Sequence, residues 1–411
     1  MKNILIAIRS IFKKGRHNVM KIVSLGIGLA VGLVLIAKVY FEQSYDDFYP
    51  DRDRVYQVWA KYQQNGGELK DYPQTSGGIA PTMQQQIPEI ETVTRYTSFG
   101  DWTFTMTDTK MKYSGRCIIA DSCFFDILPR PMLIGNAKEV LSTPMYVLIS
   151  SRIAKNIGGD VIGKNFTVDN SPGRTMTIGG VFEEVPENSH SRYDVIVSMA
   201  SAGRFMWEGS PTNMLGNDRY ISYVKLHKGV NPLALEEQVR TFVNSYFPPE
   251  EQQKVGLSID FSFHKLDNLH KELPQVKRMT WILSLLAFAL IFTAVMNYIL
   301  IVISSIVNRS KEVAVHKCYG ASENNIHGMM FGEALVHIVL SLILALLLIL
   351  AFRGTVEELL ATSLDSLLLS NGSLVLLGIC ILVFFVSGFM PGSLYARIPV
   401  ASAFRNYREN K

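Results

Sequence analysis

The stretch IVSLGIGLAVGLVLIAKVYF, residues Ile22–Phe41, decides the class of fold. It contains a single charged residue, Lys38, and a helix of about 20 apolar residues is long enough to cross the hydrocarbon core of a bilayer. A cleaved signal peptide is the alternative. The run is longer than the apolar core of a signal, however, and it leads into the bulky, charged sequence FEQSYDDFY without a small-x-small cleavage pattern. The stretch therefore predicts an uncleaved membrane anchor.

Three further apolar stretches have the length of a membrane span: residues 279–307, 329–352 and 374–395. Residues 42–278, between the first and second spans, have ordinary globular composition and can form a sizeable core. Within them DRVYQVWAKYQ, WTFTMTD, TMTIGGVFEEV and YISYVKLHK are typical of strands, whereas residues 77–90 and 231–247 are typical of helices. We expect an α-helical membrane protein with four transmembrane helices and a large α+β extracytoplasmic domain inserted between helices 1 and 2.

Basic residues predict the orientation of the chain. Residues 42–276 carry 23 Lys and Arg against 29 Asp and Glu, a net charge of −6, although the whole chain has a net charge of +4. Thirteen basic residues lie in the segments that would share the other side of the membrane: Lys2, Arg9, Lys13, Lys14, Arg16, Lys21, Arg309, Lys311, Lys317, Arg397, Arg405, Arg408 and Lys411. Both termini are therefore predicted to be cytoplasmic and the large domain to lie outside.

These segments give a predicted division of the chain. Residues 1–21 form a basic amphipathic helix on the inner membrane surface, with Ile4, Leu5, Ile8, Ile11 and Phe12 on its apolar stripe. Residues 22–44 form the first span and a stalk, 45–275 the large domain, and 276–411 the second membrane part. The last part contains spans at about 279–307, 329–352 and 374–395, a loop at 308–328 and a cytoplasmic tail at 396–411.

The stretch GGDVIGKN, residues 158–165, is close to a phosphate-binding loop, with Gly158, Gly163 and Lys164 in register and Asn165 in place of the hydroxyl residue. Such a loop opens a helix. Here NFTVDN follows, which alternates like a strand, on the side of the membrane where ATP is scarce. The stretch predicts a glycine turn before a strand.

The sequence contains no catalytic or metal-binding motif of the HExxH, GxSxG or paired CxxC type. His190, in ENSHSRYD, is interpreted as a surface-loop histidine without a chemical role. Cys117 and Cys123 both lie in the outer domain. The sequence is compatible with a disulfide between them and with two free thiols. We expect no enzyme activity, no metal and no cofactor in this chain.

Three polar residues within the spans are functional candidates by position. Lys38 is near the outer end of the first span and is expected to extend its ammonium toward the interface. Glu333 and His337 are one helical turn apart on the third span. A proton relay is one interpretation; the one we favour is an interfacial Glu and a His packed between helices.

The loop NRSKEVAVHKCYGASENNIHG, residues 308–328, predicts a helical elbow. Two helical turns from Glu312 to Tyr319 end at Gly320, which suits the position after a helix, and Ser322 caps the helix that follows. Such an elbow can transmit a push from a cytoplasmic partner into the membrane.

This loop resembles the signature R-x-K-E-V-x-V-x-K-x-x-G-A-S of FtsX/MacB-type ABC transporter permeases, with His316 and Tyr319 at two positions that usually carry Arg and Leu. The matching residues are Arg309, Lys311, Glu312, Val313, Val315, Lys317, Gly320, Ala321 and Ser322. FEQSYDDFYPDRDRVYQV resembles a segment of Bacteroidetes-type members, and GGVFEEVPENSHSRYDVIVSM resembles the end of a MacB-like periplasmic core domain. The resemblance covers nearly the whole chain.

The resemblance implies a permease subunit of the inner membrane, without a fused ATPase, that works as a homo- or heterodimer within the lipid bilayer. ATP is bound by a separate cytoplasmic ABC ATPase dimer, which docks on the loop that includes Ala314 and His316 besides the matching residues. Hydrolysis there drives periplasmic movement by mechanotransmission, for export or efflux, in some members with a periplasmic adaptor and an outer-membrane channel. Activation of a periplasmic cell-wall hydrolase and lipoprotein extraction are the alternatives, and no nucleic-acid partner is expected.

Cysteines introduced singly at Lys13, Ser322 and Asn65, in a background without the native cysteines, test the predicted orientation in intact spheroplasts. A membrane-impermeant thiol reagent should label only the Asn65 site, because the other two are predicted to be cytoplasmic. Labelling of the Ser322 site from outside would contradict the orientation.

Overall fold

The computed structural model describes residues 18–169, 171–304, 315, 319, 323–365, 375 and 378–383. The chain divides into two compact units. One is Ser44–Leu273, called here the large unit; the other, the helical unit, is formed by the described residues of Met1–Gln43 and Pro274–Lys411.

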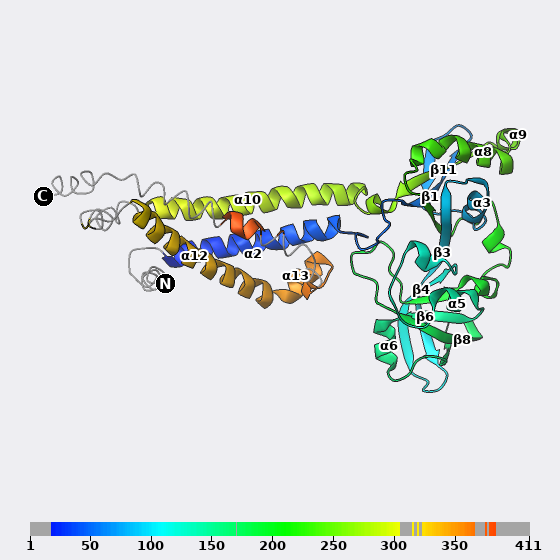
Figure 1. Ribbon diagram of the computed structural model, residues 1–411, viewed down its shortest axis with the longest axis horizontal. Helices are drawn as coiled ribbons and strands as arrows, with labels where there is room; N and C mark the ends of the chain where they lie inside the picture. Colours follow the sequence, from blue (N-terminus) through cyan, green and yellow to red (C-terminus); the bar gives the residue numbers. More distant parts are fainter. Residues whose placement is uncertain are drawn as a thin grey trace. The chain divides into compact units, whose positions relative to one another are not determined.

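The helical unit contains three helices that are long and apolar enough to cross a membrane: α2 (Asn18–Gln43), α10 (Pro274–Ser304) and α12 (Glu323–Ala351), the last with its apolar part from Phe331. A short helix, α13 (Arg353–Leu360), follows α12. Figure 1 shows α10 and α12 alongside α2, and each contacts it. Three of the predicted spans are therefore helices. The fourth, residues 374–395, is described only at 375 and 378–383, and these residues are helical.

The helix boundaries differ from the predicted ones. α2 begins at Asn18, four residues before the predicted span, and α10 begins at Pro274, five residues before its predicted span. The amphipathic helix predicted within residues 1–21 lies outside the described residues up to residue 17, as do the tail at 396–411 and most of the loop at 308–328.

Glycines let α2 and α10 approach closely. A Cβ atom on Gly28 would lie 2.2 Å from Cβ of Ala294, and one on Gly32 would lie 2.4 Å from Cγ1 of Ile291. Between membrane helices, where packing rather than the hydrophobic effect drives association, small residues at such a spacing are the usual contact. The two close approaches also fix an antiparallel register between α2 and α10.

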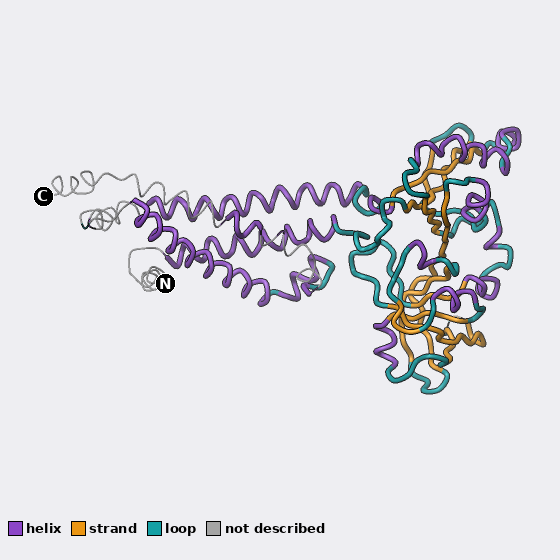
Figure 2. The backbone as a smooth tube through the Cα atoms, viewed as in Figure 1, coloured by secondary structure: helices purple, strands orange, loops and turns teal. Residues whose placement is uncertain are grey.

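The large unit is an α+β structure built on one mixed sheet of eleven strands, drawn in orange in Figure 2. The strand order is β11-β1-β10-β3-β4-β9-β6-β8-β5, with β2 on β1 and β7 between β3 and β8. The strands are β1 (Val55–Gln64), β2 (Leu69–Tyr72), β3 (Ile90–Met106), β4 (Lys112–Ala120), β5 (Met132–Ile134), β6 (Tyr146–Ser150), β7 (Asn165–Val168), β8 (Ser171–Phe182), β9 (Val195–Ser198), β10 (Ile221–Leu226) and β11 (Leu257–Lys265).

Short helices join and cover these strands. Asn231 caps a 3-10 turn that leads into α8, as its sequence predicts for a helix start. The helices are α3 (Ile79–Gln86), α4 (Phe124–Ile127), α5 (Ala137–Ser142), α6 (Ser151–Ile157), α7 (Ala202–Phe205), α8 (Glu236–Tyr246) and α9 (Pro249–Val255), and the 3-10 turns are η1 (Met199–Ser201), η2 (Ser210–Thr212), η3 (Pro232–Leu235) and η4 (Leu266–Asn268).

The pairings of six strands close a ring: β3 with β4, β4 with β9, β9 with β6, β6 with β8, β8 with β7, and β7 back to β3. Alternate residues face opposite sides of a strand. Cys117 and Ile119 of β4 accordingly join one buried cluster, with Trp102, Phe104 and Phe166, while Ile118 and Ala120 join another. A third cluster lies where α3 and α8 pack on β1, β3, β10 and β11.

The stretch GGDVIGKN is a turn before a strand, as predicted, and β7 is the strand that closes the ring. Gly158, Gly159 and Gly163 all have positive φ, which disfavours residues with a Cβ. Gly163 donates its amide hydrogen to the carbonyl of Ile178 on β8, 2.8 Å away. No helix begins at Lys164, so the stretch lacks the geometry of a phosphate-binding loop.

Cys117 and Cys123 are free thiols. Cys117 is buried on β4, where burial raises its pKa well above the ordinary range. The Cys123 thiol donates to the carbonyl of Val93, 3.0 Å away. The disulfide that the sequence left open is therefore not formed in this structure.

Gly163→Ala should lower the free energy of unfolding of the large unit by about 1 kcal/mol, because φ is +77° and an L-residue is strained there. Lys164→Ala should change it by less than about 0.5 kcal/mol, as for an ordinary surface residue. Urea unfolding of the detergent-solubilised chain, followed by tryptophan fluorescence, measures both. A larger effect of Lys164→Ala would contradict the turn assignment.

Candidate functional site

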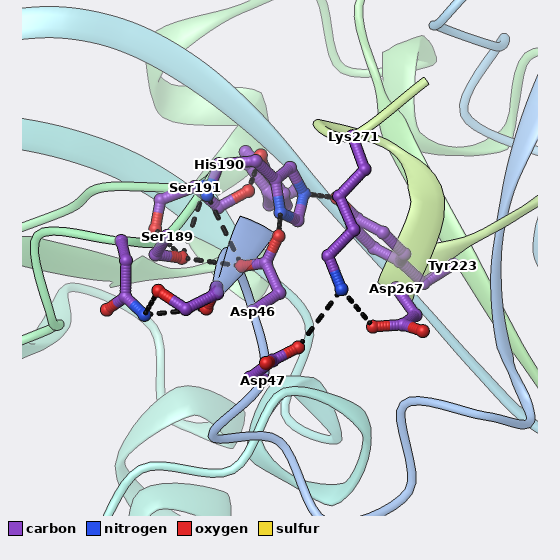
Figure 3. Close-up of polar contacts among 11 residues, drawn as sticks. Asp46, Asp47, Ser189, His190, Ser191, Tyr223, Asp267 and Lys271 are labelled. Atoms are coloured by element: carbon purple, nitrogen blue, oxygen red, sulfur yellow. Dashed lines mark hydrogen bonds and ion pairs between the residues drawn. The ribbon is translucent and has the colours of Figure 1, made fainter. Parts of the chain in front are cut away.

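A polar cluster joins the first residues of the large unit to the loop between β8 and β9 and to β10 (Figure 3). Its first segment, Ser44–Asp47, follows directly on Gln43, the last residue of α2. Its second is Asn188–Ser191. The two segments are about 144 residues apart in the chain, the separation of the Asp46 and His190 partners.

Asp46 is the centre of this cluster. It is fully buried, and its backbone has φ 60°, a left-handed conformation that Asp tolerates better than most residues. One carboxylate oxygen, Oδ1, accepts from the Ser189 hydroxyl (3.1 Å) and from the His190 amide (3.3 Å). The other, Oδ2, lies 2.7 Å from Nδ1 of His190. The carboxylate is thus hydrogen-bonded at both oxygens, as a buried charge requires.

His190 continues the chain of hydrogen bonds to Tyr223. Its Nε2 contacts the Tyr223 hydroxyl, and the two rings meet edge to face with centroids 5.9 Å apart. Burial raises the pKa of Tyr223 well above its ordinary value, so the hydroxyl stays protonated and can donate to Nε2. Nδ1 faces a carboxylate oxygen, which only accepts hydrogen bonds, so Nδ1 carries a proton that it donates to Asp46.

Two further bonds hold the second segment in place. The Asn188 side-chain amide donates to the Ser44 carbonyl (2.6 Å), and the Asp46 amide donates to the Asn188 carbonyl (2.9 Å). Ser191 and Tyr96 of β3 share a hydrogen bond of 2.6 Å. Burial raises the pKa of Tyr96 to about 12. The loop is therefore fixed both to the chain leaving α2 and to the sheet.

A second group of contacts ties the last residues of the large unit to its first. The Lys271 ammonium lies 3.2 Å from Asp47 and 2.8 Å from Asp267. The Tyr45 and His270 rings stack with centroids 3.4 Å apart. Lys271 is three residues before Pro274, the first residue of α10. Both chain crossings between the helical unit and the large unit therefore enter the same cluster.

These ion pairs shift two pKa values in opposite directions. Partial burial, the largest single effect, opposes the charge of Asp267, but the hydrogen bond from Lys271 and the positive charges of Lys271, Arg52 and Lys265 together outweigh it and lower the Asp267 pKa below its ordinary value. Partial burial likewise opposes the charge of Lys271, and its two carboxylate partners raise its pKa. The charged forms of Asp267 and Lys271 stabilise the fold at neutral pH. That stabilisation is lost as pH falls through the folded pKa of Asp267 or rises through that of Lys271.

The cluster joins distant segments of the large unit through hydrogen bonds within the protein. Every polar group of Asp46 and His190 described above is engaged within the protein. No group of three or more His, Cys, Asp or Glu side chains suited to a metal occurs among the described residues. The interpretation of His190 as a surface residue is wrong, because its side chain is only 17% exposed and bonded at both nitrogens. A local pattern could not reveal a partner so distant in sequence.

The polar residues of the spans are also placed by contacts. Lys38 pairs with Glu42, one helical turn further along α2, at 2.6 Å and donates to the Leu360 carbonyl. His337 is buried on α12 with its ring 6.2 Å from that of Tyr298 on α10, which agrees with a histidine packed between helices. Glu333 is buried as well.

Of the residues predicted to couple to an ATPase, the structure describes Val315, with the neighbouring Tyr319. The Tyr319 amide donates to the Val315 carbonyl at 3.0 Å, the spacing of a helical turn, and both side chains are exposed. The remaining residues lie outside the described part of the chain: Arg309, Lys311, Glu312, Val313, Ala314, His316, Lys317, Gly320, Ala321 and Ser322.

Residues 20–242 match the model of the MacB-like periplasmic core domain, and residues 284–400 match that of the FtsX-like permease C-terminal domain. The chain therefore belongs to the FtsX/MacB-type family of ABC transporter permeases. It is a transmembrane protein with a large extracellular domain.

Three solved structures are similar to the large unit. A domain of a Porphyromonas gingivalis protein described as a permease is 33% identical, covering 53% of this chain and 91% of its own, with a TM-score of 0.49. The periplasmic region of MacB from Actinobacillus actinomycetemcomitans is 14% identical (53% and 92% covered, TM-score 0.37). The extracellular domain of the ABC-type transporter YknZ from Gram-positive bacteria is 11% identical (50% and 98% covered, TM-score 0.35). No curated protein matches the chain significantly.

Asp46→Asn should lower the free energy of unfolding of the large unit by about 2 kcal/mol, because the amide replaces a buried charged acceptor and its NH2 group faces the Nδ1 proton of His190. The neighbouring Asp47→Asn is the matched control. It removes half-exposed ion pairs, which contribute less than about 1 kcal/mol. Urea unfolding monitored by tryptophan fluorescence compares them, and equal effects would refute the central role of Asp46.

Proposed function

We propose that this chain is the mechanotransmitting permease subunit of an export or efflux ABC transporter, driven by ATP hydrolysis on a separate cytoplasmic ATPase dimer. The observation that carries the proposal is the cluster into which both chain crossings lead, through Asp46 after α2 and Lys271 before α10. A displacement of either helix then acts on the same segment of the large unit, Ser44–Asp47.

The helices are long enough to carry such a displacement beyond the membrane. At 1.5 Å per residue, the 31 residues of α10 span about 46 Å and the 26 residues of α2 about 39 Å. The hydrocarbon core is only about 30 Å thick. Continuous helices transmit movement along their axes because every backbone hydrogen bond is internal to the helix, and the Gly28 and Gly32 contacts couple α2 to α10 laterally.

The cluster transmits movement because its members cannot separate cheaply. Pulling Asp46 from Ser189 and His190 would leave a carboxylate without its donors in a site that excludes water. Movement of the α2 end of the chain is therefore expected to carry the Asn188–Ser191 loop with it. Through the Tyr223 and Tyr96 contacts that loop acts on β10 and β3, and β3 belongs to the closed ring of strands.

The proposed movement begins at the other end of the helices, in the loop at 308–328. We propose that the ATPase docks there, with the exposed turn at Val315 and Tyr319 offering an apolar contact. The docking surface comprises Arg309, Lys311, Glu312, Val313, Ala314, Val315, His316, Lys317, Gly320, Ala321 and Ser322. The chain then lies in the inner membrane with both termini cytoplasmic and pairs with a second permease subunit, without binding ATP itself.

Variants at the two ends of this pathway distinguish docking from transmission. Glu312→Lys and Gly320→Val should reduce the amount of ATPase that co-purifies with the chain, because they invert a charge and strain the end of the predicted coupling helix. Asp46→Asn should keep the ATPase and its basal hydrolysis but abolish export in cells.

Lys164→Ala is the matched control, and should leave both co-purification and export unchanged. Full export by the Asp46→Asn variant, at a normal level in the membrane, would contradict transmission through the cluster. Normal ATPase retention by both loop variants would remove the proposed docking site.

A further inference from the structure

The short helix α13 presents a divided surface. Phe352, Val356 and Leu359 fall on one side of it at helical spacing, and Arg353, Glu357 and Glu358 on the other. Phe352 and Leu359 are 61% and 74% exposed. On the charged side, Arg353 lies 3.0 Å from Glu357 and 2.9 Å from Asp365.

The position of α13 along the chain sets its level relative to the bilayer. It begins two residues after the end of α12, a helix apolar enough to span a membrane. Exposed apolar residues run along α12 at helical spacing: Val339, Ile343, Leu346, Leu347 and Leu350. Phe352 and Leu359, which are also exposed, lie just beyond the C-terminal end of this apolar run.

A buried ion pair fixes α13 to the end of α2 nearest the large unit. Lys38 donates to the carbonyl of Leu360, the last residue of α13, and lies 2.6 Å from Glu42. Both charged side chains are nearly buried, and the ammonium sits 5.5 Å from the centre of the Phe41 ring. A cation at the carbonyl end of a helix is favourable. Figure 1 shows α13 beyond the end of α12, beside the end of α2.

A tryptophan marks the same level on α10. Gly28 lies against Ala294 and Gly32 against Ile291, so the antiparallel register places Trp281 opposite the turn that contains Phe41 and Glu42. Trp281 is 78% exposed. Tryptophan is enriched at the boundary between hydrocarbon and headgroups, and Lys38 and the end of α13 lie within about one helical turn of it.

We propose that α13 is an interfacial helix that inserts Phe352 and Leu359 into the outer leaflet of the bilayer, and that the Lys38–Glu42 pair tethers it to α2. The partner is the lipid surface itself, recognised by apolar insertion rather than by attraction to anionic headgroups, because Arg353, the basic residue of α13, is already paired. Movement of α2 is then accompanied by movement of a helix that is anchored in lipid.

Adjacent positions of α13 provide the test. Cysteines replace Leu359 and, separately, Glu358 in a chain that lacks the native cysteines; both side chains are exposed, so they differ chiefly in the direction they face. Each variant is nitroxide-labelled and reconstituted at full length in phosphatidylcholine vesicles. The Leu359 label should collide more with oxygen than with a water-soluble nickel chelate, and the Glu358 label should show the reverse. Labels at Phe352 and Gly354 should repeat the contrast.

The tether has its own readout. The double variant Lys38→Met with Glu42→Gln removes both charges together, so no carboxylate is left buried alone. It should make the Leu359 label more mobile while a label at Leu347, on α12, keeps its spectrum. Equal nickel accessibility at Leu359 and Glu358 would overturn the interfacial assignment, and unchanged mobility in the double variant would overturn the tether.

Discussion

The arrangement of the large unit depends on one buried carboxylate. Asp46 lies three residues beyond α2 and has donors from a loop about 144 residues further along the chain. A buried charge is tolerated only where it is fully hydrogen-bonded, so the Ser44–Asp47 segment and the Asn188–Ser191 loop are held in one arrangement. That constraint ties the exit of a membrane helix to a loop whose far ends are strands of the sheet, β8 and β9.

The rest of the structure extends this connection in two directions. Outward, Tyr223 and Tyr96 pass it to β10 and β3, and β3 is both a neighbour of β10 and a member of the closed ring. Toward the membrane, Asp47 and Lys271 bring the start of α10 into the same cluster. Within the helical unit, the glycines of α2 couple it to α10, and Lys38 couples it to α13. Each link is a buried hydrogen bond, an ion pair or a close helix contact.

The sequence predicts the parts of this molecule that depend on local pattern. The length of an apolar run suffices for α2, α10 and α12, and alternation or turn residues suffice for β1, β7, β10 and the Asn231 cap. The loop at 308–328 carries the signature that identified the family. Before Glu323, the structure describes only Val315 and Tyr319 of this loop. The ring of strands was not predicted, because its closure by β7 depends on pairings with strands far away in the chain.

The candidate site was missed for the same physical reason. His190 has no partner within its own segment, and nothing in ENSHSRYD indicates that Asp46 and Tyr223 will flank it. One signal was available. The two stretches that resembled family segments, FEQSYDDFYPDRDRVYQV and GGVFEEVPENSHSRYDVIVSM, contain Asp46 and His190 respectively. Two distant segments with a shared resemblance are candidates for contact, and the structure joins these two.

The central claim is that force passes through an intact junction between α2, α10 and the large unit. Cysteines at Asp47 and Lys271, in a chain without native cysteines, replace the ion pair of 3.2 Å by two thiols. A short bis-methanethiosulfonate cross-linker joins them through two disulfides, with methanesulfinate as the leaving group, and a reductant cleaves those disulfides again. Export by the complete transporter in spheroplasts is then measured before cross-linking, after it, and after reduction. The account predicts weakened export with the thiols free, recovery on cross-linking and loss again on reduction. Export that is unimpaired with the thiols free, or that does not respond to the cross-link, would contradict it.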